Sequence, residues 1–140
     1  MIVAVDTSVI VAALSPWDPR HESAARAIER LADENTLILS VHVLMEAYSV
    51  LTRLPPPRRT APAKALRALR GSFANMPVVG LAADHVWPLL ETFASRGISG
   101  GRIYDAAIAH VAREAGAEAI LTFNVRDFEN VVEGLQVLTP

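Results

Sequence analysis

An α/β fold is predicted for this chain, with a central parallel sheet of about five strands and helices on both of its faces. Short apolar runs alternate with longer segments of helical periodicity, which is the pattern of parallel strands joined by helical crossovers. The composition, 51% hydrophobic and 20% charged, is that of a globular protein. A length of 140 residues without repeat or linker indicates a single domain spanning 1–140.

The strands are predicted where apolar residues cluster over a few positions, at 2–5, 36–39, 78–79, 119–122 and 136–138. Helices are predicted where apolar residues recur every three or four positions, at 8–14, 21–33, 41–53, 62–73, 84–96 and 102–115. We expect Thr7 or Ser8 to cap the first helix, Ser40 the third and Asp84 the fifth. Pro88 then falls late in the first turn of the fifth helix, and Gly116 ends the sixth.

Several classes of protein are excluded by composition. The absence of cysteine excludes disulfides, thiolate zinc sites and cysteine nucleophiles. Apolar runs all fall short of the ~18 residues of a membrane span, and the N-terminus lacks the basic segment of a secretory signal. We therefore expect a cytoplasmic protein without a membrane partner. The histidines are scattered and show no zinc-binding spacing.

A net charge of −2 does not indicate nucleic-acid binding, but the charges are unevenly distributed. Residues 47–83 contain no Asp or Glu but hold six basic residues, namely Arg53, Arg58, Arg59, Lys64, Arg67 and Arg70. This segment is either an ordinary solvated surface or a positive rim that contacts phosphates.

Carboxylates stand at positions where a charge is costly unless it is paired. Asp6 follows the first strand, Glu46 interrupts an apolar helix that we expect to be largely buried, and Asp105 lies in a first helical turn beside small apolar residues. Asn124 and Asp127 follow the fourth strand. Each has an alternative explanation: Asp6 as a helix cap, Glu46 in a buried ion pair, Asp105 favoured by the helix dipole, and either of the last two capping a turn.

Taken together, these acids are expected at the carboxyl edge of the sheet, where sites form in parallel α/β folds. Clustered carboxylates repel one another unless a cation lies between them. Oxygen ligands without cysteine select hard ions, so the sequence predicts a site for Mg²⁺ or Mn²⁺.

The chain resembles the PIN domains, and specifically the VapC-type toxin ribonucleases. The resemblance covers essentially the whole chain and rests on "VDTSVIVAAL", "SVHVLMEAYSVLTRL", "GGRIYDAAIAHVAREAGAEAILTFNVRDFE" and the terminal strand. Matched by position, Asp6, Glu46 and Asp105 stand at the family's main acidic residues, which gives them catalytic and metal-binding roles. Asn124 stands where many members carry a fourth acid, so it is a weak metal ligand, and Asp127 is a less favoured one.

The resemblance implies Mg²⁺- or Mn²⁺-dependent hydrolysis of RNA, inhibition of translation, a homodimer and a VapB-like antitoxin partner. Hydroxyls at Thr7, Ser8 and Thr122 are expected to hydrogen-bond the carboxylates. The basic residues of 53–70 are expected to hold the RNA backbone, and Leu14, Trp17 and the helix from His21 to line a groove for the antitoxin. With only 6% aromatic residues, sequence preference is expected to come from RNA shape.

Alternatives from other classes fit less well. A haloacid-dehalogenase-type phosphotransferase requires a second Asp where this chain has Ser8, and a receiver domain requires a lysine near the last strand, whereas Lys64 is the only lysine. The remaining alternative is a non-catalytic PIN-like module that binds RNA or protein through a weakened metal site. Asn124 favours that alternative, and the three acids oppose it. Of the two residues after the fourth strand, Asp127 is expected to cap the short "FENVV" turn that follows it, with Phe128 packed inward.

Overall fold

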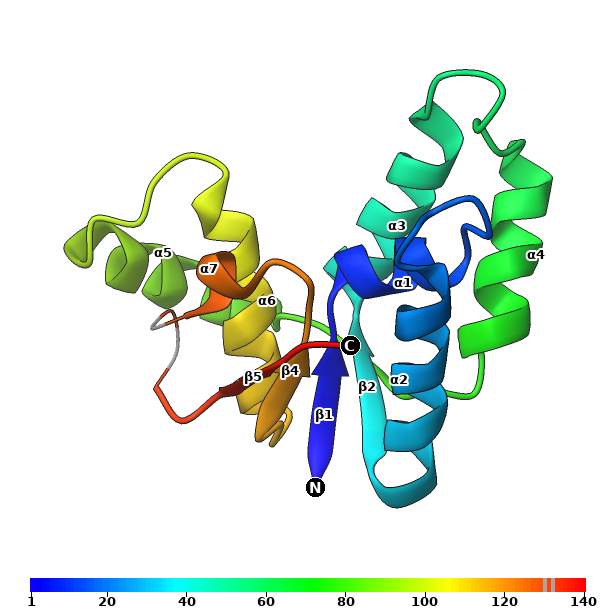
Figure 1. Cartoon of the computed structure of the whole chain (residues 1–140). Helices are drawn as coiled ribbons and strands as arrows, with labels where there is room; N and C mark the ends of the chain where they lie inside the picture. The colour runs from blue at the N-terminus through cyan, green and yellow to red at the C-terminus, as the bar shows by residue number, and fades with distance from the viewer. Residues whose placement is uncertain (130, 132) are drawn as a thin grey trace.

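The computed structural model describes residues 1–129, 131 and 133–140. Within them the strands are β1 (Ile2–Val5), β2 (Thr36–Ser40), β3 (Val78–Val79), β4 (Ala119–Leu121) and β5 (Gln136–Leu138). They form a five-stranded sheet in the order β3-β2-β1-β4-β5, and every pairing is parallel (Figure 1). The predicted α/β fold is confirmed.

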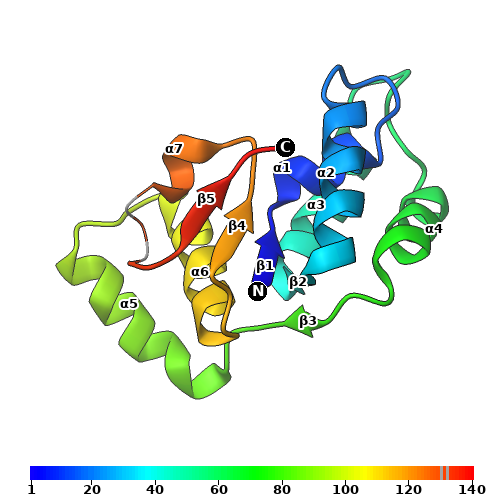
Figure 2. The same ribbon diagram turned by 60° about the horizontal axis from the view of Figure 1, so that its bottom comes forward.

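The first strand is the centre of the sheet and the point where strand order reverses. Val3 pairs with Leu37 of β2 on one side and with Ala119 of β4 on the other. The residues of β1 and β4 are almost wholly buried, as expected for parallel strands covered on both faces. Both views show α2 (His21–Glu34) against one face and α6 (Arg102–Glu114) against the other (Figures 1 and 2).

The helices of the described chain follow the predicted order closely. Besides α2 and α6 they are α1 (Thr7–Ala13), α3 (Val41–Arg53), α4 (Pro62–Phe73), the 3₁₀ turn η1 (Ala83–His85), α5 (Val86–Ser95) and α7 (Val125–Phe128). Ser40 caps α3 as predicted, because its hydroxyl accepts the backbone N–H of Val43 at 3.1 Å. Gly116 adopts a φ of +84° just beyond α6, which favours glycine and ends the helix.

Three local predictions were wrong. The first helix is capped by Asp6 rather than by Thr7 or Ser8, since its carboxylate accepts the N–H of Ser8. Asp84 lies within η1 and is not the cap of α5. Because α5 begins only at Val86, Pro88 is its third residue and falls where a missing N–H costs little.

The α3 helix is much less buried than its apolar sequence predicted. Val41, Met45 and Tyr48 are exposed, and Met45 is 69% accessible. Only one stripe of α3, through Val43, Ala47 and Leu51, packs into the core. Figure 1 shows why: α3 and α4 form a hairpin that extends away from the sheet, with their connecting loop at its far end. Among the described helices, none is long and apolar enough to span a membrane.

Candidate active site

Asp6 lies at the carboxyl end of β1, at the point where strand order reverses. Its backbone N–H donates to Leu121 of β4 at 3.0 Å, which fixes the end of β1 against the neighbouring strand. The residue is only 3% exposed. In an open parallel sheet this is the position at which ligands bind.

Hydroxyl groups hold the Asp6 carboxylate in one orientation. Ser8 Oγ donates to Asp6 Oδ2 at 2.7 Å, Thr122 Oγ1 donates to the same oxygen at 2.8 Å, and the Ser8 N–H reaches it at 3.3 Å. All of these bonds end on Oδ2, so Oδ1 accepts none from the described residues and stays free for another ligand. The backbone N–H groups of Phe123 and Asn124 donate to Ser8 Oγ and Thr122 Oγ1, which ties the turn after β4 to the same network.

Glu46 projects from α3 toward the same edge. Its side chain is 41% exposed, so the predicted burial is wrong; it also forms no ion pair with an arginine among the described residues. Thr7 Oγ1 donates to Glu46 Oε2 at 2.8 Å, and His42 Nε2 lies 3.5 Å from that oxygen. The hydroxyl of Thr7 thus orients Glu46 in the way that Ser8 and Thr122 orient Asp6.

Asp105 is the residue whose charge the site disfavours most clearly. It lies in the first turn of α6 and is partly buried. Burial, and after it the negative charges of Asp127, Asp6 and Glu46, together raise the pKa of Asp105 from its usual 3.8 to about 6. Carboxylates from four separate segments of the chain therefore act on one another at the carboxyl edge of the sheet.

The turn after β4 differs from the prediction. Residues 125–128 form the short helix α7, with Asn124 at its N-cap position but without a side-chain capping bond. Asp127 lies in the first turn of α7. The "FENVV" turn that it is predicted to cap lies partly outside the described residues, so the capping role stays a prediction. Phe128 is buried as expected. Asp127 also exerts the largest effect of any charge on Asp105, which gives it a stronger place in the site than its sequence position indicated.

The donor chemistry of this edge fits a hard divalent cation. Carboxylate oxygens are the ligands that Mg²⁺ and Mn²⁺ prefer. The pKa of Asp105 is raised by burial and then by the neighbouring negative charges, and a bound cation would relieve that repulsion. In the described part of the chain, however, no three His, Asp or Glu side chains stand close enough together to hold an ion as they are. Glu46 is turned toward Thr7 and His42. Coordination of a shared ion therefore requires side-chain rearrangement.

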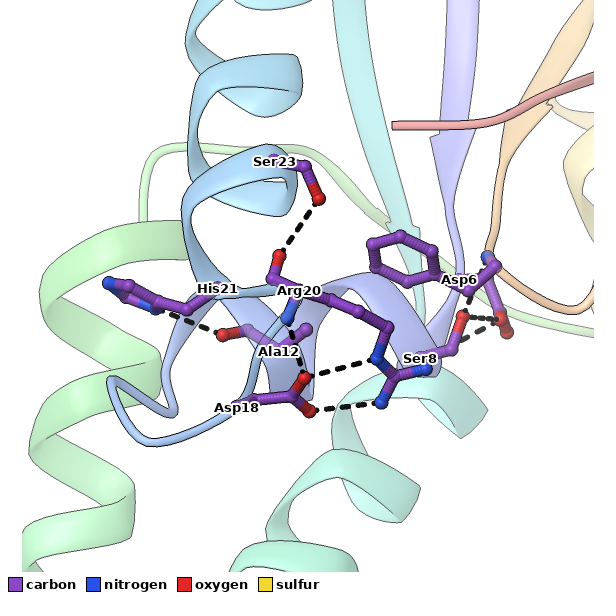
Figure 3. A network of polar contacts seen from close by, with 8 residues as sticks. Asp6, Ser8, Ala12, Asp18, Arg20, His21 and Ser23 are labelled. Carbon is purple, nitrogen blue, oxygen red and sulfur yellow. Dashed lines mark hydrogen bonds and ion pairs between the residues drawn. The ribbon is translucent and has the colours of Figure 1, made fainter.

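A second network, not anticipated from the sequence, braces this edge (Figure 3). The guanidinium of Arg20 forms two hydrogen bonds with the carboxylate of Asp18, at 3.1 and 2.9 Å, and lies 4.9 Å from the centre of the Phe123 ring. Arg20 lowers the pKa of the buried Asp18. Because the Phe123 N–H is bound to Ser8, this ion pair supports the turn beside Asp6. The sequence signal was Asp18 in a proline-flanked turn, where Asp commonly accepts the N–H two residues on.

The predicted RNA-binding residues are all exposed on the α3–α4 hairpin and its loop, namely Arg53, Arg58, Arg59, Lys64, Arg67 and Arg70. Two of them have partners within the protein. Arg58 lies 4.4 Å from the centre of the Trp17 ring, and Arg59 donates to the carbonyl of Leu54. Trp17, predicted to contact a partner protein, and Arg58, predicted to contact RNA, thus form a single surface.

Comparison with known proteins places the chain in a family. The PIN-domain family model matches residues 3–134. The chain is 38% identical over 128 residues to Ribonuclease VapC40 of Mycobacterium tuberculosis strain H37Rv, covering 91% of this chain and 90% of that protein. It is also 38% identical over 117 residues to Ribonuclease VapC27 of the same strain, covering 83% and 80%.

Solved structures agree in fold. VapBC2 from Rickettsia felis, crystallised with a promoter DNA fragment, matches with a TM-score of 0.73 at 20% identity, over 100% of this chain and 99% of that one. VapC20 of Mycobacterium tuberculosis, described as a toxin that cleaves the sarcin–ricin loop, matches with a TM-score of 0.69 at 24% identity, over 89% and 92%. The chain belongs to the PIN-domain family.

Proposed function

We propose that this protein is a Mg²⁺- or Mn²⁺-dependent endoribonuclease and the toxin of a type II toxin–antitoxin pair. The observation that carries the activity is the 38% identity to Ribonuclease VapC40 along 91% of the chain. The arrangement of acids around Asp105 supports a catalytic site over the alternative of a non-catalytic binding module.

Asp6, Glu46 and Asp105 would hold the metal ion, with Asp127 and Asn124 as further oxygen donors. When bound, such an ion lowers the pKa of a coordinated water and neutralises charge on a scissile phosphate. The hydrogen bonds that Asp6 accepts from the described residues all end on Oδ2, which orients the carboxylate and leaves Oδ1 to bind the ion. Asp105 has a pKa of about 6, so without a cation it retains a proton on part of the molecules near neutral pH.

The hydroxyls orient the acids. Ser8 and Thr122 fix Asp6 between β1 and β4, and Thr7 fixes Glu46 on α3. Such contacts hold carboxylates in the geometry that metal binding requires, and their loss typically weakens metal affinity or activity by about 10- to 100-fold. These three residues therefore act by positioning the carboxylates.

The substrate and the partners follow from the same family membership. The basic residues of the α3–α4 hairpin would contact the RNA backbone, which makes binding salt-dependent. A VapB-like antitoxin, a homodimer and action on RNA in the cytoplasm complete the proposal. We place the antitoxin contact at Leu14, Trp17 and α2, beside the Trp17–Arg58 contact.

Cleavage of total cellular RNA in Mg²⁺, with and without EDTA, tests the activity. Wild type is expected to cleave only in the presence of the ion. Asp6→Ala and Asp6→Asn are both expected to be inactive. Because asparagine can still cap α1, Asp6→Asn separates the effect of losing the charge from the effect of losing the cap. Asp33→Asn, an exposed change on α2, is the matched control. Full activity in EDTA would refute metal dependence, and RNA binding without any cleavage would favour the non-catalytic module.

A further inference from the structure

Two aromatic rings from different helices are stacked beside the acidic cluster. The rings of His42, on α3, and Tyr104, on α6, have centroids 5.2 Å apart and are nearly parallel, with an angle of 7° between them. Aromatic rings in proteins pack in several geometries, and a face-to-face offset stack presents flat surfaces to either side. The pair thus forms a planar element that spans the two helices.

The position of this pair relates it to the acids. His42 Nε2 lies 3.5 Å from Glu46 Oε2, and Tyr104 directly precedes Asp105 in the first turn of α6. Both rings are therefore attached to segments that carry acids of the site. A group that stacks on either ring comes to rest next to the carboxylates.

The pair is exposed, although its stacking would suit a buried contact. Tyr104 is 58% exposed, and the side chain of His42 is 40% exposed. A ring pair that served only to join α3 to α6 would be expected to lie within their interface. More than half of the tyrosine surface here is instead available to another molecule.

An apolar groove of about 530 Å³, lined by residues of both helices and by Gly80 and Leu81, begins at His42. His42 and Met45 line it from α3, and Ala107, Ile108 and Val111 line it from α6. Residues 107 and 108 follow Tyr104 by three and four positions, so they lie on its side of α6. His42 therefore belongs both to the stacked pair and to the wall of this groove.

We propose that Tyr104, supported by His42, is the platform on which a nucleobase of single-stranded RNA stacks next to the scissile phosphate, an inference that rests on the proposed ribonuclease function. Every nucleobase has a flat π-face, so a platform of this kind accepts single-stranded RNA and anchors one base. Unstacked bases held on aromatic side chains are the usual means of recognising single-stranded RNA. The platform adds an aromatic contact where the composition had suggested recognition through RNA shape alone.

Binding of a short single-stranded RNA oligonucleotide, measured in an Asp6→Asn background so that it stays intact, tests the platform. Tyr104→Ala is expected to weaken binding by about 5- to 150-fold, the usual effect of losing one base–aromatic stack. Tyr104→Phe is expected to restore most of the affinity, and His42→Phe to keep the stack while removing the contact with Glu46. Trp87→Ala, which removes an even more exposed aromatic on α5, is the matched control.

Oligonucleotides with a single abasic position locate the stacked base. At one position, loss of the base is expected to weaken binding to the Asp6→Asn protein as much as Tyr104→Ala does, and to add nothing when the two changes are combined. The slope of affinity against salt should not change, because no phosphate contact is lost.

Failure of the platform is distinguishable from failure of the proposed function. If wild type neither binds nor cleaves RNA, the ribonuclease proposal fails. If wild type cleaves RNA while Tyr104→Ala binds every oligonucleotide like its parent, the platform alone is refuted. A Tyr104→Ala protein that binds RNA normally but changes its oligomeric state would also refute it, since the exposed ring would then belong to a protein interface.

Discussion

Replacing Asp105 with Asn should stabilise the metal-free protein at neutral pH. Asparagine has nearly the same shape and remains polar, but it carries no charge. The substitution therefore removes the ionisation that burial and the charges of Asp127, Asp6 and Glu46 oppose. The same variant should be inactive, because Asp105 is one of the proposed metal ligands.

The size of the effect follows from the pKa shift. A change from 3.8 to about 6 is about two units, and each unit corresponds to about 1.4 kcal/mol. Converting the whole shift into free energy of unfolding gives about 3 kcal/mol. Because Asp105 is only partly buried and salt screens the neighbouring charges, we expect a gain of about 1.5 kcal/mol. For a domain of this size that is a rise in melting temperature of about 3–6 °C.

The pH dependence has a definite sign. Because the folded pKa is raised, the native state binds more protons than the unfolded state between pH of about 4 and 6. The free energy of unfolding contributed by Asp105 therefore falls as pH rises through that interval and is constant above it. Asp105→Asn should abolish this fall, so the two proteins should differ little near pH 4 and most above pH 6.

Thermal melts in EDTA across this pH range measure the difference. Asp33→Asn on α2 controls for the general effect of removing a negative charge. Added Mg²⁺ should raise the melting temperature of wild type and have little effect on Asp105→Asn, since an ion that binds the native state stabilises it by mass action. A variant that melts with the wild-type pH profile, or below wild type at neutral pH, would refute the view that neighbouring charges oppose the ionisation of Asp105.

Other residues give shorter tests. Combined Arg58→Ala and Arg59→Ala should weaken RNA binding and reduce its salt slope by about two without altering metal affinity, whereas an unchanged slope would make the segment an ordinary surface. Trp17→Ala should weaken capture of the proposed VapB-like antitoxin, and equal capture would exclude Trp17 from that contact. Asn124→Asp should lower the Mg²⁺ concentration needed for cleavage, while Asn124→Ala should reduce activity only partly. Asp127→Ala removes the largest charge effect on Asp105, so it should leave the melting temperature in EDTA unchanged or higher and raise the Mg²⁺ requirement; a drop in melting temperature would instead support the predicted capping role.

The order and type of the elements could be predicted because each depends on local sequence. Strands at 2–5 and 36–40 are short apolar runs between polar residues, and Ser40 has the chemistry of a helix cap. Prediction was less reliable where a tertiary arrangement decides. The apolar sequence of α3 suggested burial, but a helical hairpin that extends from the sheet exposes Met45. Periodicity indicates that a helix has an apolar face and cannot indicate what covers it.

The site was predictable in its acids and less so in its contacts. Asp6 and Asp105 could be located because a strand end and a first helical turn have known places in an α/β sheet. Contacts between segments far apart in the sequence could not be predicted from the local pattern of either segment. The stacking of His42 on Tyr104 and of Arg20 on Phe123 depends on how α3, α6 and the loops meet, which no spacing within one segment encodes.

The arrangement around Asp6 and Asp105 shows how the fold tolerates a cluster of like charges. Asp6 accepts hydrogen bonds from the hydroxyl and N–H of Ser8 in α1 and from the hydroxyl of Thr122 just after β4, so its carboxylate is well satisfied at the centre of the sheet. Asp105 accepts no side-chain hydrogen bond from the described residues. Its raised pKa shows that its ionised form is unfavourable in the folded protein. That energy is recovered when a cation binds, because the repulsion between carboxylates becomes attraction to the ion. Stability without metal and affinity for metal should therefore change in opposite directions when the charge of Asp105 is removed.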